Sequence, residues 1–240
     1  MEAKHNNYNH ISGARRMKEI LNQADVDYQE RDTLPTRDAL TFNNGFYAYC
    51  SALFIDIRES SKLPDKHTRP VLARMYRAFV SEMVAIFASF SRCREVNIVG
   101  DCVWAVYNTP TTDDIDEVFS VAALASSMVN IFNKELEKKG FTTIKVGIGM
   151  SYGRALMIKA GYEGSGMNDV VYMGDVVNHA AKLAANGSKT YNDSRFMVSD
   201  VFRQNLNDHN KGLLTWNSTR RCWHGYVVRM DVDEWTGENY

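Results

Sequence analysis

Apolar residues along this chain follow two patterns, which are short continuous runs typical of buried strands and longer stretches with helical spacing. The runs predict strands at about 46–55, 93–99, 102–107, 144–150 and 154–160. The helical spacing predicts helices at about 68–90, 110–140 and 175–185. Because strands alternate with helices that can cover one face of a sheet, the pattern predicts an α+β sandwich.

Residues with strong local preferences mark the ends of these elements. Thr68 suits the cap of a helix and Pro70 suits its first turn. Only Gly100 and Asp101 separate the second and third strands, which is the loop length that hairpins favour. Residues 151–153 predict a further turn between two strands.

The two ends of the chain are less clearly patterned. Residues 1–45 are polar, and we expect an N-terminal extension that is partly helical, at about 11–30, or flexible. One domain is expected over 46–235. Its last part predicts a strand, a short helix and two strands that end near 229–230.

The composition narrows the class of protein. Of 240 residues, 45% are hydrophobic and 24% are charged, which predicts one sizeable core. The net charge of −1 gives no strong attraction to nucleic acid or to an anionic membrane. The apolar stretches fall short of a membrane span, and residues 1–7 lack the apolar region of a signal peptide. We therefore expect a cytoplasmic protein with no membrane or nucleic-acid partner.

The four cysteines agree with that compartment. They show no Cys-x-x-Cys spacing, and three of them lie in apolar, strand-like runs. Buried free thiols in a reducing cytosol are therefore favoured over a disulfide or zinc framework.

Two aspartates carry the first sign of chemistry. Asp56 and Asp101 each stand at the end of a short apolar run. Neighbouring strands of one sheet would bring the two carboxylates together, and a divalent cation relieves the repulsion between such a pair. The pair therefore predicts a metal site.

Four segments resemble the catalytic domain of class III nucleotide cyclases, the adenylate and guanylate cyclase family. Residues 54–61 resemble the family's F-x-D-I-x-G-F-T segment, and 98–101 resemble its I-G-D hairpin. Residues 146–153 resemble its G-I-G-x-x-x-G strand, and 173–182 resemble its x-G-D-x-V-N-x-A-x-R helix start. The resemblance covers about 46–230. It implies the family's palm-type, ferredoxin-like sandwich with a mostly antiparallel sheet.

The resemblance also implies a reaction. In this family a ribose 3′-hydroxyl attacks the α-phosphorus of its own nucleotide, and pyrophosphate leaves. By resemblance, Asp56, Asp101 and the backbone carbonyl of Ile57 hold two divalent cations, Mn²⁺ or Mg²⁺. Glu59 stands where the family usually has glycine. The triphosphate-binding candidates are Arg58, Ser60, Ser61, Arg220 and Arg221.

Two residues of the third helix match the family's catalytic pair. Asn178 matches the asparagine that orients the ribose, and Lys182 stands where the family usually has a transition-state arginine. Their i, i+4 spacing places them on one helix face. The family shares each active site between two subunits, so the resemblance implies a homodimer.

The residues that would read the base depart from the purine patterns. Asn97 stands where adenylate cyclases use lysine and guanylate cyclases commonly use glutamate. Val171 stands where adenylate cyclases use aspartate or threonine and guanylate cyclases commonly use cysteine. Tyr49 and Tyr172 are bulky base-binding candidates that could fit the pocket to a smaller base. The Asn97 amide carries a donor and an acceptor, so it matches either the uracil N3–H and O4 edge or the cytosine N3 and N4 edge.

This pocket is similar to that of bacterial stand-alone pyrimidine cyclases of the Pycsar anti-phage systems, whose cyclic product activates a separate effector. We therefore predict conversion of UTP to 3′,5′-cyclic UMP and diphosphate, as a second messenger in antiviral defence. The alternatives are a cytidylate cyclase that makes cyclic CMP, an atypical adenylate or guanylate cyclase, and a catalytically silent nucleotide-binding dimer.

Overall fold

The computed structural model describes residues 7–24, 28–164 and 166–240, which form a nine-stranded mixed sheet with helices on both faces. The strand order is β3-β4-β2-β5-β7-β9-β8, with β1 paired to β2 and β6 paired to β5. The β5–β7 and β1–β2 pairs are parallel and the others are antiparallel. The predicted α+β class with a mostly antiparallel sheet is confirmed.

The strands are β1 (Tyr28–Glu30), β2 (Gly45–Ile57), β3 (Cys93–Val99), β4 (Cys102–Tyr107), β5 (Val146–Tyr162), β6 (Met167–Met173), β7 (Phe196–Val198), β8 (Thr215–Asn217) and β9 (Cys222–Gly225). The α-helices are α1 (His10–Leu21), α2 (Arg69–Ala88), α3 (Thr112–Lys138), α4 (Asp175–Ala184), α5 (Asp200–Gln204), α6 (Asp208–Gly212) and α7 (Met230–Asn239). The described residues also include the short 3₁₀ helices η2 (Arg37–Ala39) and η3 (Ser60–Asp65).

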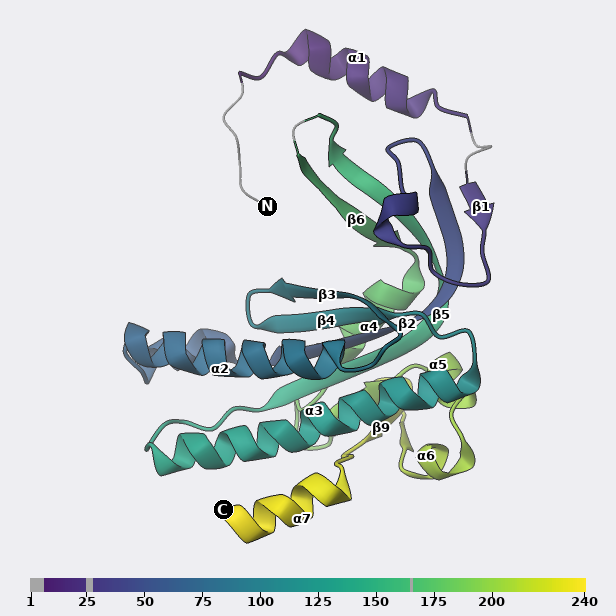
Figure 1. Ribbon diagram of the computed structural model, residues 1–240. Helices are drawn as coiled ribbons and strands as arrows, with labels where there is room; N and C mark the ends of the chain where they lie inside the picture. Colours follow the sequence, from purple (N-terminus) through teal and green to yellow (C-terminus); the bar gives the residue numbers. More distant parts are fainter. Residues whose placement is uncertain (1–6, 25–27, 165) are drawn as a thin grey trace.

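Strands β2 and β5 form the long centre of the sheet. They pair without interruption from Gly45 opposite Ile158 to Ile57 opposite Val146. The turn predicted at 151–153 is therefore wrong, because these residues continue β5 and pair with β2. The hairpin turn comes instead at the glycine-rich segment between β5 and β6. The far halves of β2 and β5, with β1 and β6, rise above the body of the molecule (Figure 1).

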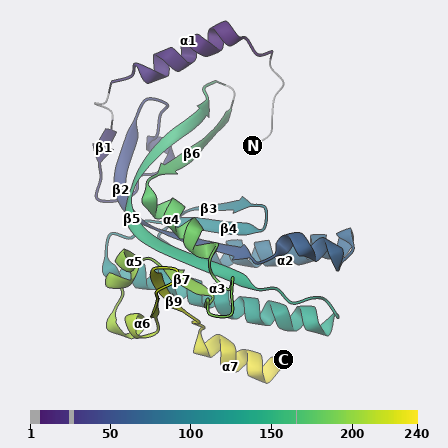
Figure 2. The ribbon, with the colours of Figure 1, turned by 180° about the vertical axis from the view of Figure 1, so that it is seen from behind.

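The alternation of side chains along β2 separates two cores. Leu53 and Ile55 pack on one face with α2 and α3. Ala52 and Phe54 pack on the other face with α4. Figure 2 shows α4 lying across β2 and β5 on the side away from α2 and α3. The helices therefore cover both faces of the sheet rather than the single face that the sequence predicted.

Helix α3 fills the core, although it is also long and apolar enough to cross a membrane by length and composition. Core helices commonly meet that test. The 18-residue apolar stretch of α3 that is long enough to cross a membrane is 61% buried inside the protein.

The N-terminal extension is partly built into the fold. Helix α1 ends at Leu21, and strand β1 then takes part of the range predicted as helix. Leu34 and Leu40 are buried in the core on the α4 side, and the Leu34 amide donates to Asn108 Oδ1 over 2.8 Å. The rest of the extension, at 1–6 and 25–27, lies outside the described residues.

Helix α7 at the C-terminal end was missed by the sequence pattern, which predicted strand up to about 229–230. The helix packs on α3. All four cysteines are free thiols, as predicted, and Cys50 and Cys222 are buried.

Candidate active site

Asp56 and Asp101 lie together at one end of the central strands. Asp56 on β2 pairs with Cys102 on β4, and Asp101 is the residue just before Cys102 in the β3–β4 turn. Burial raises the pKa of Asp56, the charge of Arg58 lowers it, and the charge of Asp101 raises it further. The two carboxylates are therefore close enough to repel each other, as the sequence predicted.

The chemistry of this pair fits a divalent cation. Asp101 Oδ2 is buried and has no hydrogen-bond partner. A buried carboxylate oxygen without a donor is costly, and a cation satisfies it. Among the described residues no three His, Cys, Asp or Glu side chains gather as a ligand set. A cation held by one or two carboxylates and completed by water and substrate phosphate is the usual Mg²⁺ arrangement.

Neighbouring groups respond to the same negative charge. Burial, then the charges of Asp56 and Asp101, raise the pKa of the Cys102 thiol to about 12. Burial and the two aspartates also raise the pKa of Tyr76 on α2, and Ser60 acts in the opposite direction. Tyr76 was not predicted, although it falls on the buried side of its helix pattern.

The loop after β2 holds the first set of triphosphate candidates. Arg58 forms an ion pair with Asp56, and its Nη1 donates over 2.8 Å to the backbone carbonyl of Ala185 at the end of α4. Ser60 is half-buried in the first turn of η3, and Ser61 is exposed beside it. Glu59 has φ 54° and ψ 31°, the left-handed conformation that glycine adopts most readily.

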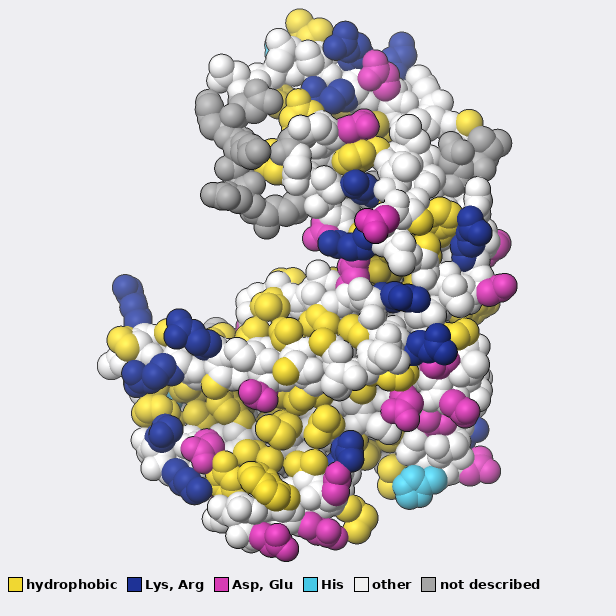
Figure 3. Space-filling view, viewed as in Figure 1, with side chains coloured by type: hydrophobic (Ala, Val, Ile, Leu, Met, Phe, Trp, Pro, Cys, Tyr) yellow, Lys and Arg dark blue, Asp and Glu magenta, His cyan; other side chains and the backbone are white. Residues whose placement is uncertain are grey.

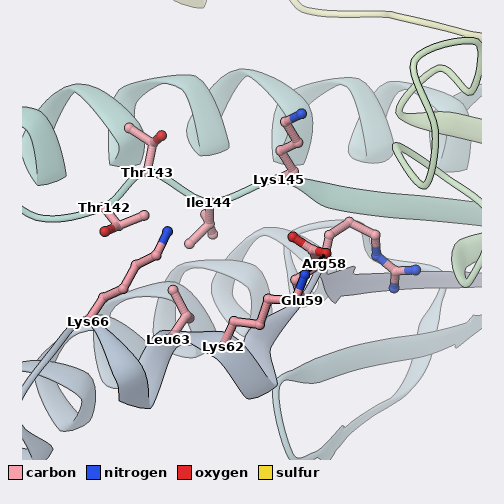
Figure 4. A pocket seen from close by; sticks show the side chains of 9 residues that line it. All are labelled: Arg58, Glu59, Lys62, Leu63, Lys66, Thr142, Thr143, Ile144 and Lys145. Atoms are coloured by element: carbon pink, nitrogen blue, oxygen red, sulfur yellow. Dashed lines mark hydrogen bonds and ion pairs between the residues drawn. The ribbon is translucent and has the colours of Figure 1, made fainter.

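Three lysines that the sequence did not single out lie around the same loop. A pocket between η3 and the segment before β5 is lined by four cations, one carboxylate and four uncharged side chains, namely Arg58, Lys62, Lys66, Lys145, Glu59, Leu63, Thr142, Thr143 and Ile144 (Figure 4). Glu59 pairs with Lys62. The three lysines are exposed. Lys62 and Lys66 follow Arg58 closely and are four residues apart, so their proximity is visible in the sequence. Lys145 is distant in the sequence and is brought to the pocket by the fold.

Arg220 and Arg221 are placed in the β8–β9 turn. Arg220 is held by Asp193 through two hydrogen bonds of 3.0 and 2.7 Å. This partner lowers the pKa of Asp193 to about 2. Arg221 has a positive φ of 53° in the same turn. Arg220 thus already has an anionic partner within its own chain, and phosphate binding by this pair stays a prediction.

Asn178 and Lys182 lie on the outer side of α4. Both are exposed, whereas Val176, Ala180 and Ala184 on the opposite helix face pack on the sheet. The predicted shared face is confirmed. Because that face points away from the sheet of its own chain, the pair is available to another molecule.

The structure brings together only two of the four base-binding candidates. Asn97 on β3 and Tyr172 on β6 both lie near Glu95. Burial and then the charge of Glu95 raise the pKa of Tyr172. Burial raises the pKa of Glu95, and the Asn97 side chain is among the weaker influences that lower it. Tyr49 lies seven residues before Asp56 on β2, so the strand alternation turns it to the opposite face, where it stacks on Tyr152 at 5.8 Å. Val171 is likewise turned away from Tyr172 and is 41% exposed. Within one chain the predicted grouping of Tyr49 and Val171 with Asn97 is not reproduced.

A family comparison agrees with this arrangement. The model of the adenylate and guanylate cyclase catalytic domain matches residues 43–215, which include both aspartates and the α4 pair. The chain belongs to this family. Class III cyclases generally depend on divalent metal ions, act on nucleoside triphosphates and commonly dimerise.

Individual proteins of known identity are also similar to this cyclase domain. A uridylate cyclase of Gulbenkiania mobilis is 38% identical over 100% of both chains. A uridylate cyclase of Treponema porcinum is 38% identical over 87% of this chain and 72% of its own. The crystal structure of a class III adenylyl cyclase-like ATP-binding protein from Pseudomonas aeruginosa is similar, with a TM-score of 0.70 and 20% identity over 92% of this chain and 48% of its own. At that identity the last comparison shows the fold alone.

Proposed function

We propose that the protein is a uridylate cyclase that converts UTP to 3′,5′-cyclic UMP and diphosphate. The observation that carries this proposal is the pair Asp56 and Asp101, held together at the end of the central strands with Asp101 Oδ2 buried and unpartnered. The nucleotide is proposed from the full-length relative of 38% identity that is named a uridylate cyclase.

The residues suggest a division of labour in the reaction. When bound by Asp56, Asp101 and the backbone carbonyl of Ile57, two divalent cations, Mg²⁺ or Mn²⁺, supply the positive charge that activates the attacking oxygen and neutralises the phosphates. The ribose O3′ forms a bond to the α-phosphorus, the bond from that phosphorus to the β-phosphate oxygen breaks, and diphosphate leaves. The hydroxyl proton passes to water.

The basic pocket beside η3 supports binding of the triphosphate tail. Arg58 with Lys62, Lys66 and Lys145 gives four cations around the loop that also carries Ser60 and Ser61 (Figure 4). Such groups hold the β- and γ-phosphates and stabilise the negative charge that builds up on the leaving diphosphate.

We place the remaining catalytic groups on a second copy of the chain. Asn178 orients the ribose, and Lys182 offers its charge to the α-phosphate as a point charge rather than the planar fork of an arginine. Their exposure on the outer face of α4 supports a homodimer with shared sites. In such a dimer the exposed Tyr49 and Val171 are also free to contact the base from the partner's side.

The direct test is a turnover assay of UTP, CTP, ATP and GTP with Mn²⁺, with the product identified by mass. We expect cyclic UMP as the main product and a loss of at least a hundredfold in kcat for Asp56→Ala and Asp101→Ala, because each removes a charged metal ligand. Asp208→Ala, on the exposed helix α6, is the matched control and should keep full activity. Dominant turnover of ATP or GTP, or no turnover at all, would contradict the proposal.

A cytidylate cyclase is the second candidate. The observation that favours it is the Asn97 amide, which offers both a donor and an acceptor to a pyrimidine. The CTP arm of the same assay separates the two.

We also propose that the product is a second messenger of bacterial antiviral defence, made in the cytoplasm and sensed by a separate effector. The free cysteines and the soluble cyclase family support a reducing cytoplasmic location. Cyclic UMP should rise after phage infection of cells that carry the wild-type chain and stay flat with Asp101→Ala. A constant level after infection with the wild-type chain would contradict the signalling role.

A further inference from the structure

A cluster of polar side chains forms where β3 approaches β6, on the same side of the sheet as α4. The hydroxyl of Tyr172 is buried and has no hydrogen-bond partner, with the residue only 8% exposed. Asn97 Nδ2 is also buried without a partner within 3.5 Å. Glu95 is two residues before Asn97 on β3 and therefore on the same strand face, and its charge also acts on Tyr172. Two unsatisfied buried donors beside one carboxylate are rare in a finished core, and they mark a polar pocket.

Arg37, from the N-terminal segment, holds Glu95 in place. Arg37 Nε donates to Glu95 Oε1 over 2.7 Å, and Arg37 Nη2 pairs with Asp169 on β6. The guanidinium therefore ties β3, which carries Asn97, to β6, which carries Tyr172. The Glu95 side chain is only 8% exposed, so its charge depends on this cation. Figure 3 shows charged side chains of both signs at the inner end of the hollow between the upper and lower parts of the molecule.

An ionised carboxylate only accepts hydrogen bonds, so it fixes which end of a neighbouring amide faces it. Asn97 is two residues from Glu95 on the same strand face, and only its Nδ2 end can donate to that carboxylate. Burial raises the pKa of Glu95, and the Asn97 side chain acts in the opposite direction, as a donor directed at the carboxylate does. This leaves Oδ1, an acceptor, directed away from Glu95. Uracil carries a hydrogen at N3 and cytosine carries a lone pair there. An acceptor at this position pairs with uracil and repels cytosine.

We propose that Arg37 and Glu95 are positioning residues that fix the Asn97 amide and thereby select uracil over cytosine. Neither side chain needs to touch the nucleotide, because each acts through the orientation of Asn97. The inference rests on the proposed pyrimidine cyclase function and on the assignment of Asn97 to the base. It gives the N-terminal segment around η2 a role in substrate choice.

The experiment measures kcat and KM for UTP and CTP on the full chain with Mn²⁺. Glu95→Gln replaces the pure acceptor with an amide that accepts either orientation of Asn97. We expect the UTP-to-CTP ratio of kcat/KM to fall at least tenfold, through a raised KM for UTP, with kcat for UTP kept within threefold. Arg37→Gln should act in the same direction, and Arg37→Lys, which keeps one positive charge, should recover part of the ratio.

Arg154→Gln is the matched control, because Arg154 also ties the N-terminal segment to the sheet, through an ion pair with Glu30. It should keep the UTP-to-CTP ratio of the wild type. Thermal melting shows that each variant is folded. If Glu95→Gln does not fold, the Arg37 variants carry the test, since that side chain is 55% exposed.

Two results would overturn the inference while leaving the proposed function in place. One is a wild type selective for UTP whose ratio is unchanged in Glu95→Gln and Arg37→Gln. The other is an equal loss with UTP and CTP in those variants, which would show only structural support. A wild type that prefers a purine, or turns over nothing, would instead overturn the proposed function and this inference with it.

Discussion

Glu59 stands where the family usually has glycine, yet it adopts the backbone conformation that glycine favours. Its φ of 54° and ψ of 31° lie in the left-handed region, where a residue with a Cβ is strained and glycine is not. It caps η3 without a side-chain hydrogen bond, and its carboxylate pairs with Lys62 instead. The loop that follows Asp56 therefore keeps the backbone conformation that a glycine would adopt at this position.

Substitutions at this position should rank by their tolerance of a positive φ. We expect Glu59→Gly to leave the free energy of unfolding unchanged or raise it by up to about 1 kcal/mol, and Glu59→Val to lower it by about 1–2 kcal/mol. Urea unfolding followed by circular dichroism measures both. In helix α3, Glu137→Gly should have the opposite sign, a loss of about 1 kcal/mol. A strong loss for Glu59→Gly would show that the carboxylate, rather than the backbone, holds the loop.

The candidate site could be predicted from sequence where a residue's place follows from its own strand or helix. Asp56 and Asp101 end two apolar runs, and Asn178 and Lys182 share a helix face by spacing alone. Tyr49 was grouped with Asn97 although an offset of seven residues from Asp56 already turned it to the other face. Arg37 gave no such signal, because it meets Glu95 across 58 residues of chain.

At the scale of whole elements, pairing overrode local preference. Residues 151–153 have the composition of a turn, yet β2 offers them partners on both sides of that point, so β5 runs through for 17 residues. The end of the chain was missed for another reason, since α7 forms against α3 rather than through a strong pattern of its own. The predicted start of α2 was correct, with Thr68 at the N-cap and Pro70 in the first turn, but the Thr68 side chain makes no capping hydrogen bond. The side-chain cap is made instead at Thr111, which accepts from the Asp114 amide in a capping box at the start of α3.

The position of α4 depends on a glycine of β5. A Cβ at Gly149 would stand 2.1 Å from the Ala180 carbonyl oxygen and 2.3 Å from the Ala184 amide nitrogen. Because these are backbone atoms, Gly149→Ala must push α4 from the sheet, and with it Asn178 and Lys182. We expect a loss of about 2–4 kcal/mol in the free energy of unfolding, and reduced turnover in the protein that remains folded.

Gly153→Ala on the same strand is the matched control for this effect. Its Cβ would meet only the Val176 side chain, at an ordinary 3.6 Å. It should change the free energy of unfolding by less than about 1 kcal/mol. Equal changes in the free energy of unfolding for the two substitutions would show that direct contact with β5 does not fix the position of α4.

The ion pair between Asp193 and Arg220 of the β8–β9 turn should make the free energy of unfolding depend on pH. The pKa of Asp193 is about 2 in the folded chain because Arg220 holds its charged form, against an ordinary value of 3.8. A depressed folded pKa stabilises the protein above pH 3.8, and this contribution is lost as the pH falls towards 2. The contribution at pH 7 is of the order of 1–2 kcal/mol.

Asp193→Asn tests that contribution. It should lower the free energy of unfolding at pH 7 and reduce the difference between pH 7 and pH 3, both measured by urea unfolding. Asp208→Asn, at a fully exposed aspartate, should leave both quantities unchanged. A variant with the same pH dependence as the wild type would show that the ion pair does not control acid stability.

For the whole molecule, the proposed shared site combines the two aspartates of one chain with the α4 pair of another. Asp56 and Asp101 are at the strand ends, whereas Asn178 and Lys182 face outward from the far side of α4. Apolar side chains are exposed at the end of β3 and along β6, namely Ile98, Val99, Val171 and Met173. Such exposure is typical of a surface that meets a partner, and a second copy of the chain is the partner that would complete the site.

Mixing two inactive variants tests the shared site. In the proposed site Asp101→Ala removes a metal ligand and Asn178→Ala removes the ribose contact, so each homodimer should lose at least a hundredfold in kcat. In a heterodimer both defects fall in one site and the other site is intact. Co-expression in equal amounts should therefore restore about a quarter of wild-type activity, since half of the dimers are mixed and each has one good site. Asp56→Ala mixed with Asp101→Ala is the control and should restore nothing, because both belong to the same half of the site. If that control recovers activity, or the first mixture does not, each chain forms its active site alone.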